Sequence, residues 1–240
     1  MTNSVIYNAP EIREILPDGA DAICIKETES TNTIAREYIS SGAKNGTLIV
    51  ADRQSGGRGR RGKSFFSPDG GIYMSVIVRE QNGVPYTVCA AAAVCKALRS
   101  FGVDAKIKWV NDVFIDGRKV CGILCERVDG YIIIGIGINH SIKDFPDELK
   151  LIATSLPAGV PDRQKTVCTV AKELFGALAN VCDSKAYYAK NMMLYGKKVI
   201  YELNGTEQIG TVTGLGDNEE LIIETECGNV AITSGMVTLC

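Results

Sequence analysis

The alternation of apolar and polar residues predicts several strands and helices along the chain. Residues 46–54, GTLIVADRQ, form a short apolar run typical of a buried strand, and residues 71–80, GIYMSVIVRE, alternate well enough for a second strand. The alanine-rich stretch PYTVCAAAAVCKALRSFG predicts a helix that Pro85 opens and Gly102 closes. Another helix is expected over about residues 166–183. The chain therefore mixes both kinds of element.

One segment near the N-terminus joins a strand to a helix whose start is rich in polar groups. Residues 21–43 predict a strand followed by a helix, and Gly42 fits the end of that helix. Ser30, Thr31 and Asn32 can each cap its start. Helix N-termini also receive anions and polar ligand groups, so this triplet alone does not distinguish a cap from a binding site.

Two Asp-Gly pairs predict β-hairpins in the middle of the chain. Residues 104–109 and 113–126 read as strands, with an Asp-Gly turn at 116–117. Residues 126–139 repeat the pattern around the Asp-Gly pair at 129–130. Helices combined with hairpins favour a mixed α/β layer structure over a doubly wound parallel sheet.

The pattern of predicted elements changes after about residue 193. From there on, short strands are separated by Asn-Gly, Gly-Asp-Asn and Cys-Gly-Asn turns, which suggests a small antiparallel barrel of about fifty residues. We therefore expect an α+β protein in two parts. Residues 1–192 would form the larger domain, and residues 193–240 the small barrel.

The bulk composition is that of an ordinary globular protein. The 240 residues carry 26 Lys+Arg and 28 Asp+Glu, a net charge of −2, and 45% of them are hydrophobic. A near-neutral charge speaks against a general nucleic-acid-binding protein. No apolar run is as long as a membrane span, and the N-terminal segment has no signal-peptide core. We therefore expect a cytoplasmic protein with reduced thiols.

The nine cysteines and the single histidine offer little metal or nucleophile chemistry. There is no C-x-x-C pair, and His140 is the one imidazole for a zinc site or a Ser-His-Asp triad. Both kinds of site are disfavoured, and we assign no metal-binding side chains.

Positive charge is concentrated in the stretch GGRGRRGKSFFSPDGG, which starts at Gly56. Glycines let backbone N–H groups converge on an anion, and guanidinium groups hold phosphate or carboxylate oxygens in pairs. A loose G-x-x-x-x-G-K-S string occurs here, but no helix follows it, so it is not a Walker loop. The stretch is either a solvated surface loop or a cover for a small anion.

A second polar cluster lies in KWVNDVFIDGRKVCGILCE, residues 108–126. Lys108, Asn111, Asp112 and Lys119 stand among apolar strand residues, where charged side chains are rare unless they are paired. A structural ion pair and a reaction site that needs a cation beside a carboxylate both fit this pattern.

Together, the motifs ESTN, GRGRRG, KWVNDV, GRKVCGILCE and GIGIN resemble the biotin protein ligase family over nearly the whole chain. The chain has Val110 where a common family form has proline, and Phe65 where some members have tryptophan. The resemblance implies a catalytic domain like those of class II synthetases and biotin–lipoate ligases, followed by an SH3-like barrel. It also implies a biotin–acetyl-CoA-carboxylase ligase. Such an enzyme converts biotin and ATP, with Mg²⁺, to biotinyl-5′-AMP and then biotinylates a lysine of a biotin carboxyl carrier protein.

The resemblance further implies roles for individual residues. Lys119 would bring two anions together, Asp112 would receive the ammonium of the carrier, and Arg60 would hold phosphate, so these three are the expected catalytic residues. The expected biotin contacts are Ser30, Thr31, Asn32, Gln54, Arg58, Gly59, Arg60, Lys119 and Gly122. The expected contacts of ATP or the adenylate are Gly57, Arg58, Arg60, Arg61, Asn111, Lys119 and Asn139.

Two alternative functions are weighed against this one. A lipoate–protein ligase would share the broad fold, but its typical Arg-Arg and triple-Gly motif is absent. A nucleic-acid-binding module would use the arginine stretch and the barrel, but few aromatic residues accompany the basic ones. Only about twenty residues precede the first core strand, so we expect no winged helix and no specific DNA binding. Relatives are monomers or homodimers, and the sequence leaves both states open.

Overall fold

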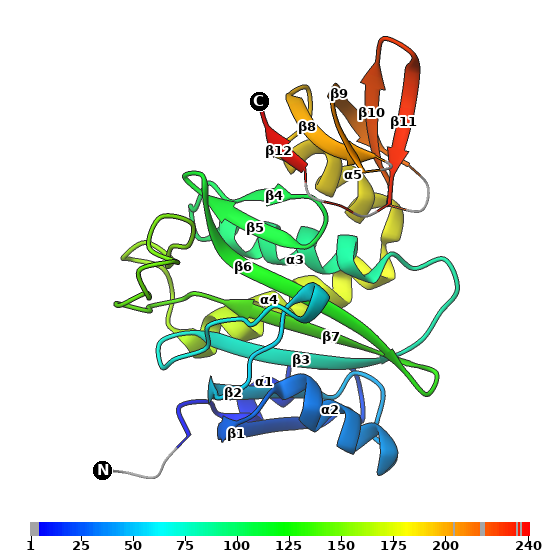
Figure 1. The fold of residues 1–240 in the computed structure, drawn as a ribbon. Coiled ribbons are helices and arrows are strands. Elements are labelled where there is room, and N and C mark those ends of the chain that lie inside the picture. The colour runs from blue at the N-terminus through cyan, green and yellow to red at the C-terminus, as the bar shows by residue number, and fades with distance from the viewer. Residues whose placement is uncertain (1–4, 204, 217–218, 234, 236) are drawn as a thin grey trace.

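The chain folds into two sheets, one after the other along the sequence (Figure 1). The computed structural model describes residues 5–203, 205–216, 219–233, 235 and 237–240. The first sheet has seven strands in the order β1-β2-β3-β7-β6-β5-β4, and the second has five in the order β11-β10-β9-β8-β12. In the first sheet β1 and β2 are parallel and the other pairs are antiparallel. The expected α+β class with a mixed main sheet is confirmed.

The elements have the following bounds. The strands of the first sheet are β1 (Ala22–Thr28), β2 (Leu48–Gln54), β3 (Ile72–Arg79), β4 (Lys106–Lys108), β5 (Asp112–Ile115), β6 (Arg118–Val128) and β7 (Tyr131–Ile138). The helices are α1 (Ala9–Arg13), α2 (Thr31–Ser40), α3 (Tyr86–Ser100), α4 (Arg163–Ala179) and α5 (Val181–Asn191). The strands of the second sheet are β8 (Lys198–Leu203), β9 (Thr206–Leu215), β10 (Leu221–Thr225), β11 (Gly228–Ile232) and β12 (Val237–Leu239). The second sheet thus begins a few residues after position 193, where the pattern of the sequence changes.

The two predicted hairpins are present, but one predicted helix is not continuous. Asp116 and Asp129, each followed by glycine, have positive φ angles of 48° and 47°, as two-residue hairpin turns with positive φ require. The single helix predicted over residues 166–183 is wrong, because α4 and α5 are separate helices that meet at Asn180. Asn180 has φ −127° and ψ 69°, outside the helical region. Asparagine is a weak helix former, which fits a break at this position.

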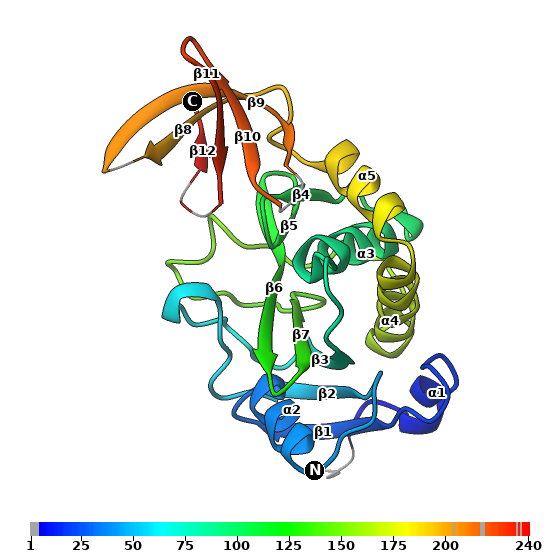
Figure 2. The ribbon, with the colours of Figure 1, turned by 90° about the vertical axis from the view of Figure 1, so that its right-hand side faces the viewer.

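Helices cover one face of the main sheet fully and the other face only in part. Figure 2 shows α3, α4 and α5 along one side of the sheet, and the short cyan turn at residues 60–62 on the opposite side. Because side chains alternate along a strand, Val50 packs in the large core while its neighbour Ile49 packs against α2. Helix α2 covers only part of its face. The open part, over β6 and β7, is where glycines lie at positions 122, 135 and 137.

None of the helices in the described ranges is long and apolar enough to cross a membrane. All nine cysteines are free thiols.

Candidate active site

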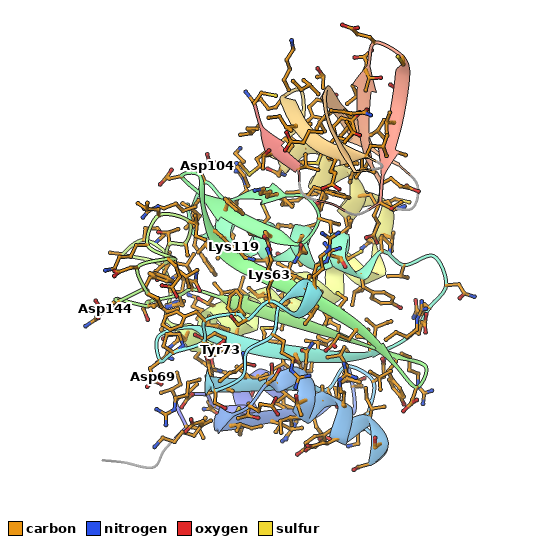
Figure 3. The ribbon with its side chains drawn as sticks, in the orientation of Figure 1. Lys63, Asp69, Tyr73, Asp104, Lys119 and Asp144 are labelled. Carbon is orange, nitrogen blue, oxygen red and sulfur yellow. The ribbon has the colours of Figure 1, made fainter. Side chains whose placement is uncertain are left out.

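The open part of the sheet is the floor of a cavity of about 410 Å³. The cavity is bordered by the start of α2, by β5 and β6, by β12 and by residues 56–66, which we call the Arg loop. Figure 3 shows Lys63 of this loop and Lys119 of β6 over the same part of the sheet. The predicted site residues that line the cavity are Ser30, Thr31, Asn32, Gln54, Arg58, Gly59, Arg60, Arg61, Asn111, Asp112, Lys119 and Gly122. The structure therefore gathers most of the predicted site in one place.

Two predicted nucleotide contacts, Gly57 and Asn139, lie behind the cavity wall. A Cβ atom on Gly57 would come within 2.3 Å of Ser67 Oγ and 2.4 Å of the Phe65 carbonyl oxygen, so glycine lets the Arg loop pack closely. Asn139 is buried, and its Nδ2 donates to the Lys119 carbonyl oxygen at 3.5 Å. Both residues support the wall, and their contact with nucleotide stays a prediction.

A buried polar network fixes the start of α2 against the sheet. The Thr31 backbone N–H and hydroxyl both donate to Gln54 Oε1, at 2.8 and 3.2 Å. Ser75 Oγ lies 2.7 Å from Thr31 Oγ1 and 2.6 Å from Asn32 Oδ1. Asn32 Nδ2 donates to Glu126 Oε2 at 2.7 Å. Because buried polar groups need partners, this network sets the orientation of the hydroxyl and amide groups at this end of the cavity.

Sequence reasoning missed four residues that help to build the site. A Cβ atom on Gly135 would lie 2.4 Å from Asn32 Oδ1, and one on Gly137 would lie 2.5 Å from Phe65 Cε1. Both glycines stand in the motif GIGIN, and residues two apart in a strand share a face. That spacing was the available signal. Ser75 and Glu126 gave no signal beyond being polar in apolar strands.

A β-bulge brings Lys119 into the cavity. Val113 of β5 pairs with Cys121 of β6, but the next residue, Phe114, pairs with Lys119, so Val120 has no partner in this ladder. Val120 and Cys121 are both fully buried in the core. Since one extra residue reverses the alternation of side chains, Lys119 faces the cavity and not the core.

Lys119 forms an ion pair at the cavity wall. Its Nζ lies 2.7 Å from Asp112 Oδ1, and the two side chains are 31% and 25% exposed. Asp112 Oδ1 is buried and has no hydrogen-bond partner among the described residues, so this ion pair is its principal interaction. Lys119 Nζ also lies 5.8 Å from the ring centroid of Phe65, within cation–π range. The pair is thus both structural and accessible to a ligand.

The Arg loop is folded and tied to two neighbouring elements. Backbone hydrogen bonds within the loop close it on itself. Arg58 Nη2 pairs with Glu29 Oε1 at 2.7 Å. Arg60 Nη1 donates to Asn111 Oδ1 at 3.2 Å. The two arginines therefore anchor the loop on opposite sides of the cavity, one before α2 and one before β5.

Comparisons with known proteins agree with this geometry. The model of the biotin/lipoate A/B protein ligase family matches residues 24–139, which span β1 to β7. The bifunctional ligase/repressor BirA of Bacillus subtilis is 35% identical over 240 residues, covering 88% of this chain and 71% of that protein. The biotin–acetyl-CoA-carboxylase ligase of Mycobacterium tuberculosis is 28% identical, covering 89% of this chain and 86% of that protein.

Solved structures show the same similarity. The biotin protein ligase from Aquifex aeolicus, in complex with biotin and ATP, superimposes with a TM-score of 0.81 at 30% identity. That match covers 91% of this chain and 98% of the other. The chain therefore belongs to the biotin protein ligase family and is an enzyme of the ligase class.

Proposed function

We propose that this enzyme activates biotin with ATP to biotinyl-5′-AMP and then transfers biotin to a lysine of the biotin carboxyl carrier protein of acetyl-CoA carboxylase. The observation that carries the proposal is one cavity with a polar network at one end and Lys119 at the other. The Aquifex aeolicus relative, solved with biotin and ATP, supports it. The Mycobacterium tuberculosis and Aquifex aeolicus relatives are biotin ligases by name, which favours biotin over lipoate.

The polar end of the cavity suits the head group of biotin. A ureido ring has two N–H donors and a carbonyl acceptor, and each needs a partner once it is buried. Ser30, Thr31, Asn32 and Gln54 offer hydroxyl and amide groups there. The thin apolar tail of biotin would lie along the floor beside the ring of Phe65, which packs closely on Gly122 and Gly137. Arg58 and Gly59 would close over it.

The other end suits two reacting anions. In the first step a carboxylate oxygen of biotin attacks the α-phosphorus of ATP, and pyrophosphate leaves. Lys119 and Arg60 place positive charge at this point, which offsets the repulsion between carboxylate and phosphate. In the second step the carrier amine attacks the acyl carbon and AMP leaves. Asp112 is placed beside Lys119 to attract the carrier ammonium and accept its proton.

The proposal also includes a metal ion and a cellular compartment. The described ranges hold no group of three or more His, Cys, Asp or Glu side chains that could bind a metal ion. We infer that Mg²⁺ arrives with ATP, held mainly by its phosphate oxygens, as is usual for this ion. Nine free thiols fit a reducing compartment such as the cytoplasm.

Mass spectrometry of the protein after incubation with biotin, ATP and Mg²⁺ tests the function directly. We expect bound biotinyl-AMP, and no adenylate when lipoate replaces biotin. Adding the carrier domain should discharge the adenylate and raise the carrier mass by one biotin. Absence of any adenylate would contradict the proposal, and a lipoyl adenylate would favour the alternative ligase.

Arg60→Ala should weaken retention of the adenylate. The change removes a guanidinium that borders the cavity and is positioned by Asn111. Loss of one charged hydrogen bond, about 1.5–3 kcal/mol, predicts release of biotinyl-AMP about 10- to 100-fold faster. Rapid gel filtration of the preformed complex measures this rate. The control is Arg127→Ala, a 74% exposed arginine of β6 outside the cavity. Release at the wild-type rate would exclude Arg60 from the phosphate site.

A further inference from the structure

A second cavity, of about 350 Å³, lies beside the first. The two cavities have Arg60, Arg61, Ile123 and Leu124 in common. The remaining lining residues of the second cavity are Thr87, Val110, Cys125, Glu219 and Thr233. Glu219 is the one carboxylate among these lining residues, and it comes from the C-terminal sheet. The second cavity therefore brings a negative charge of that sheet next to the arginines of the Arg loop.

The backbone of Glu219 is hydrogen-bonded to the larger domain. Glu219 stands between β9 and β10 in the sequence, and Figure 2 shows this end of the C-terminal sheet next to β4 and β5. Trp109 Nε1 donates to the backbone carbonyl oxygen of Glu219 at 2.9 Å. Glu219 has a φ of 70°, a conformation that few non-glycine residues adopt. The side chain thus starts from a backbone that a residue of the KWVND motif holds in place.

The charges around Glu219 come from two elements besides its own turn. Burial raises the pKa of its carboxyl above the ordinary value, whereas Lys185 of α5 and Arg60 of the Arg loop lower it, and its neighbour Glu220 raises it. Arg60 is at the same time hydrogen-bonded to Asn111 on its other side. The guanidinium of Arg60 is therefore bonded to an amide oxygen and lies in the field of a half-buried carboxylate.

We propose that Glu219 is a positioning residue for Arg60. The C-terminal sheet supplies a fixed negative charge behind the Arg loop, and Asn111 supplies the hydrogen bond. Together they hold the guanidinium at the cavity before nucleotide arrives. A cation that is already in place loses less side-chain freedom when phosphate binds, and it stabilises charge in the transition state without reorganising. This inference rests on the proposed function, in which Arg60 contacts phosphate, and it extends that function by assigning a role to the C-terminal sheet.

Glu219→Gln tests the proposal because it removes the charge and keeps the size and the backbone carbonyl. We expect the kcat of biotin-dependent pyrophosphate exchange to fall about five- to twentyfold, within the range of one displaced electrostatic group. Binding of biotin alone, measured by calorimetry, should not change. The matched control is Glu224→Gln, an exposed glutamate of β10 that lines neither cavity, and it should behave as wild type. Glu219→Asp, which keeps the charge, should recover most of the exchange rate.

A double-mutant cycle separates positioning from a merely structural role. If Glu219 acts through Arg60, Glu219→Gln should cause no further loss in an Arg60→Ala background, because interacting residues are not additive. Full additivity would overturn the proposal, and so would wild-type exchange by Glu219→Gln. Trp109 is the single tryptophan, so its emission reports whether the turn stays docked. An emission shift that Glu219→Asp also shows would point to detachment of the turn and overturn the proposal as well.

Failure of the proposed function would give a different result from failure of the positioning role. In that case the wild-type protein itself would show no biotin-dependent exchange. The positioning role then still has a readout without activity, because trypsin cleaves after the arginines of the Arg loop. Cleavage in residues 58–63 should be at least twofold faster in Glu219→Gln than in wild type or Glu224→Gln, since a less restrained segment opens more often. Equal cleavage would contradict the proposal on its own.

Discussion

Lys119→Ala is expected to slow biotin-dependent pyrophosphate exchange by about 10²–10³-fold, the effect of removing one preorganised charge from a transition state. The bulge at Val120 turns this lysine away from the core and into the cavity, beside Asp112 and the Phe65 ring. No other described side chain takes that position. Without it, carboxylate and phosphate approach each other with their repulsion less fully offset.

The neighbouring residue provides the control for this prediction. Arg118→Ala also removes a cation from β6, but Arg118 is exposed and does not line the cavity, so exchange should stay near the wild-type rate. Lys119→Ala also leaves Asp112 without its ion-pair partner, which by itself can lower stability. Lys119→Met combined with Asp112→Asn removes both charges, so it should regain melting temperature without regaining exchange. Near-normal exchange by Lys119→Ala would remove this side chain from the mechanism.

Gly135→Ala should weaken the binding of biotin by about 100-fold, or about 2.7 kcal/mol. The added methyl would lie 2.4 Å from Asn32 Oδ1, which is closer than a Cβ atom comes to a non-bonded heavy atom in real structures. Asn32 is buried and bonded to Glu126, so it can move only by breaking the network at the start of α2. Calorimetric titration with biotin, without ATP, measures the loss.

A second glycine shows whether the effect is specific. Gly214→Ala, in β9, introduces the same methyl into a strand where nothing lies within 4 Å, so biotin affinity should not change. Wild-type affinity in Gly135→Ala would show that the network around Asn32 is not the site of the head group. Equal losses in both variants would indicate a general destabilisation of strands.

The sequence was informative where a local rule determined the structure. The alternation in β3, the closing Gly102 after α3 and the Asp-Gly turns each follow from the conformations that their own residues allow. The positions that line the cavity were found mainly through the resemblance of short motifs. These motifs gather in one place because they stand at the start of α2, in the Arg loop and on the adjacent strands β5 and β6.

Other features depend on distant parts of the chain and could not be read locally. The bulge at Val120 reflects how β5 and β6 pair, which no period in β6 alone discloses. The contact of Gly57 with the ligand stays a prediction, and the close packing of Ser67 and Phe65 against this glycine could not be foreseen. The contact between Trp109 and Glu219 joins residues 110 positions apart. Tertiary contacts of this kind override local preference.

The bulge in β6 makes the side of the sheet on which the Lys119 amine lies depend on how β6 pairs with β5 more than on residue identity. Exchanging Val120 for another apolar side chain of similar volume leaves the ladder offset as it is. A regular ladder over the same residues would instead pair Phe114 with Val120, and the Lys119 amine would then point through the sheet into the hydrocarbon interior. Anyone who grafts or recombines this strand therefore has to preserve the offset in its pairing before its composition.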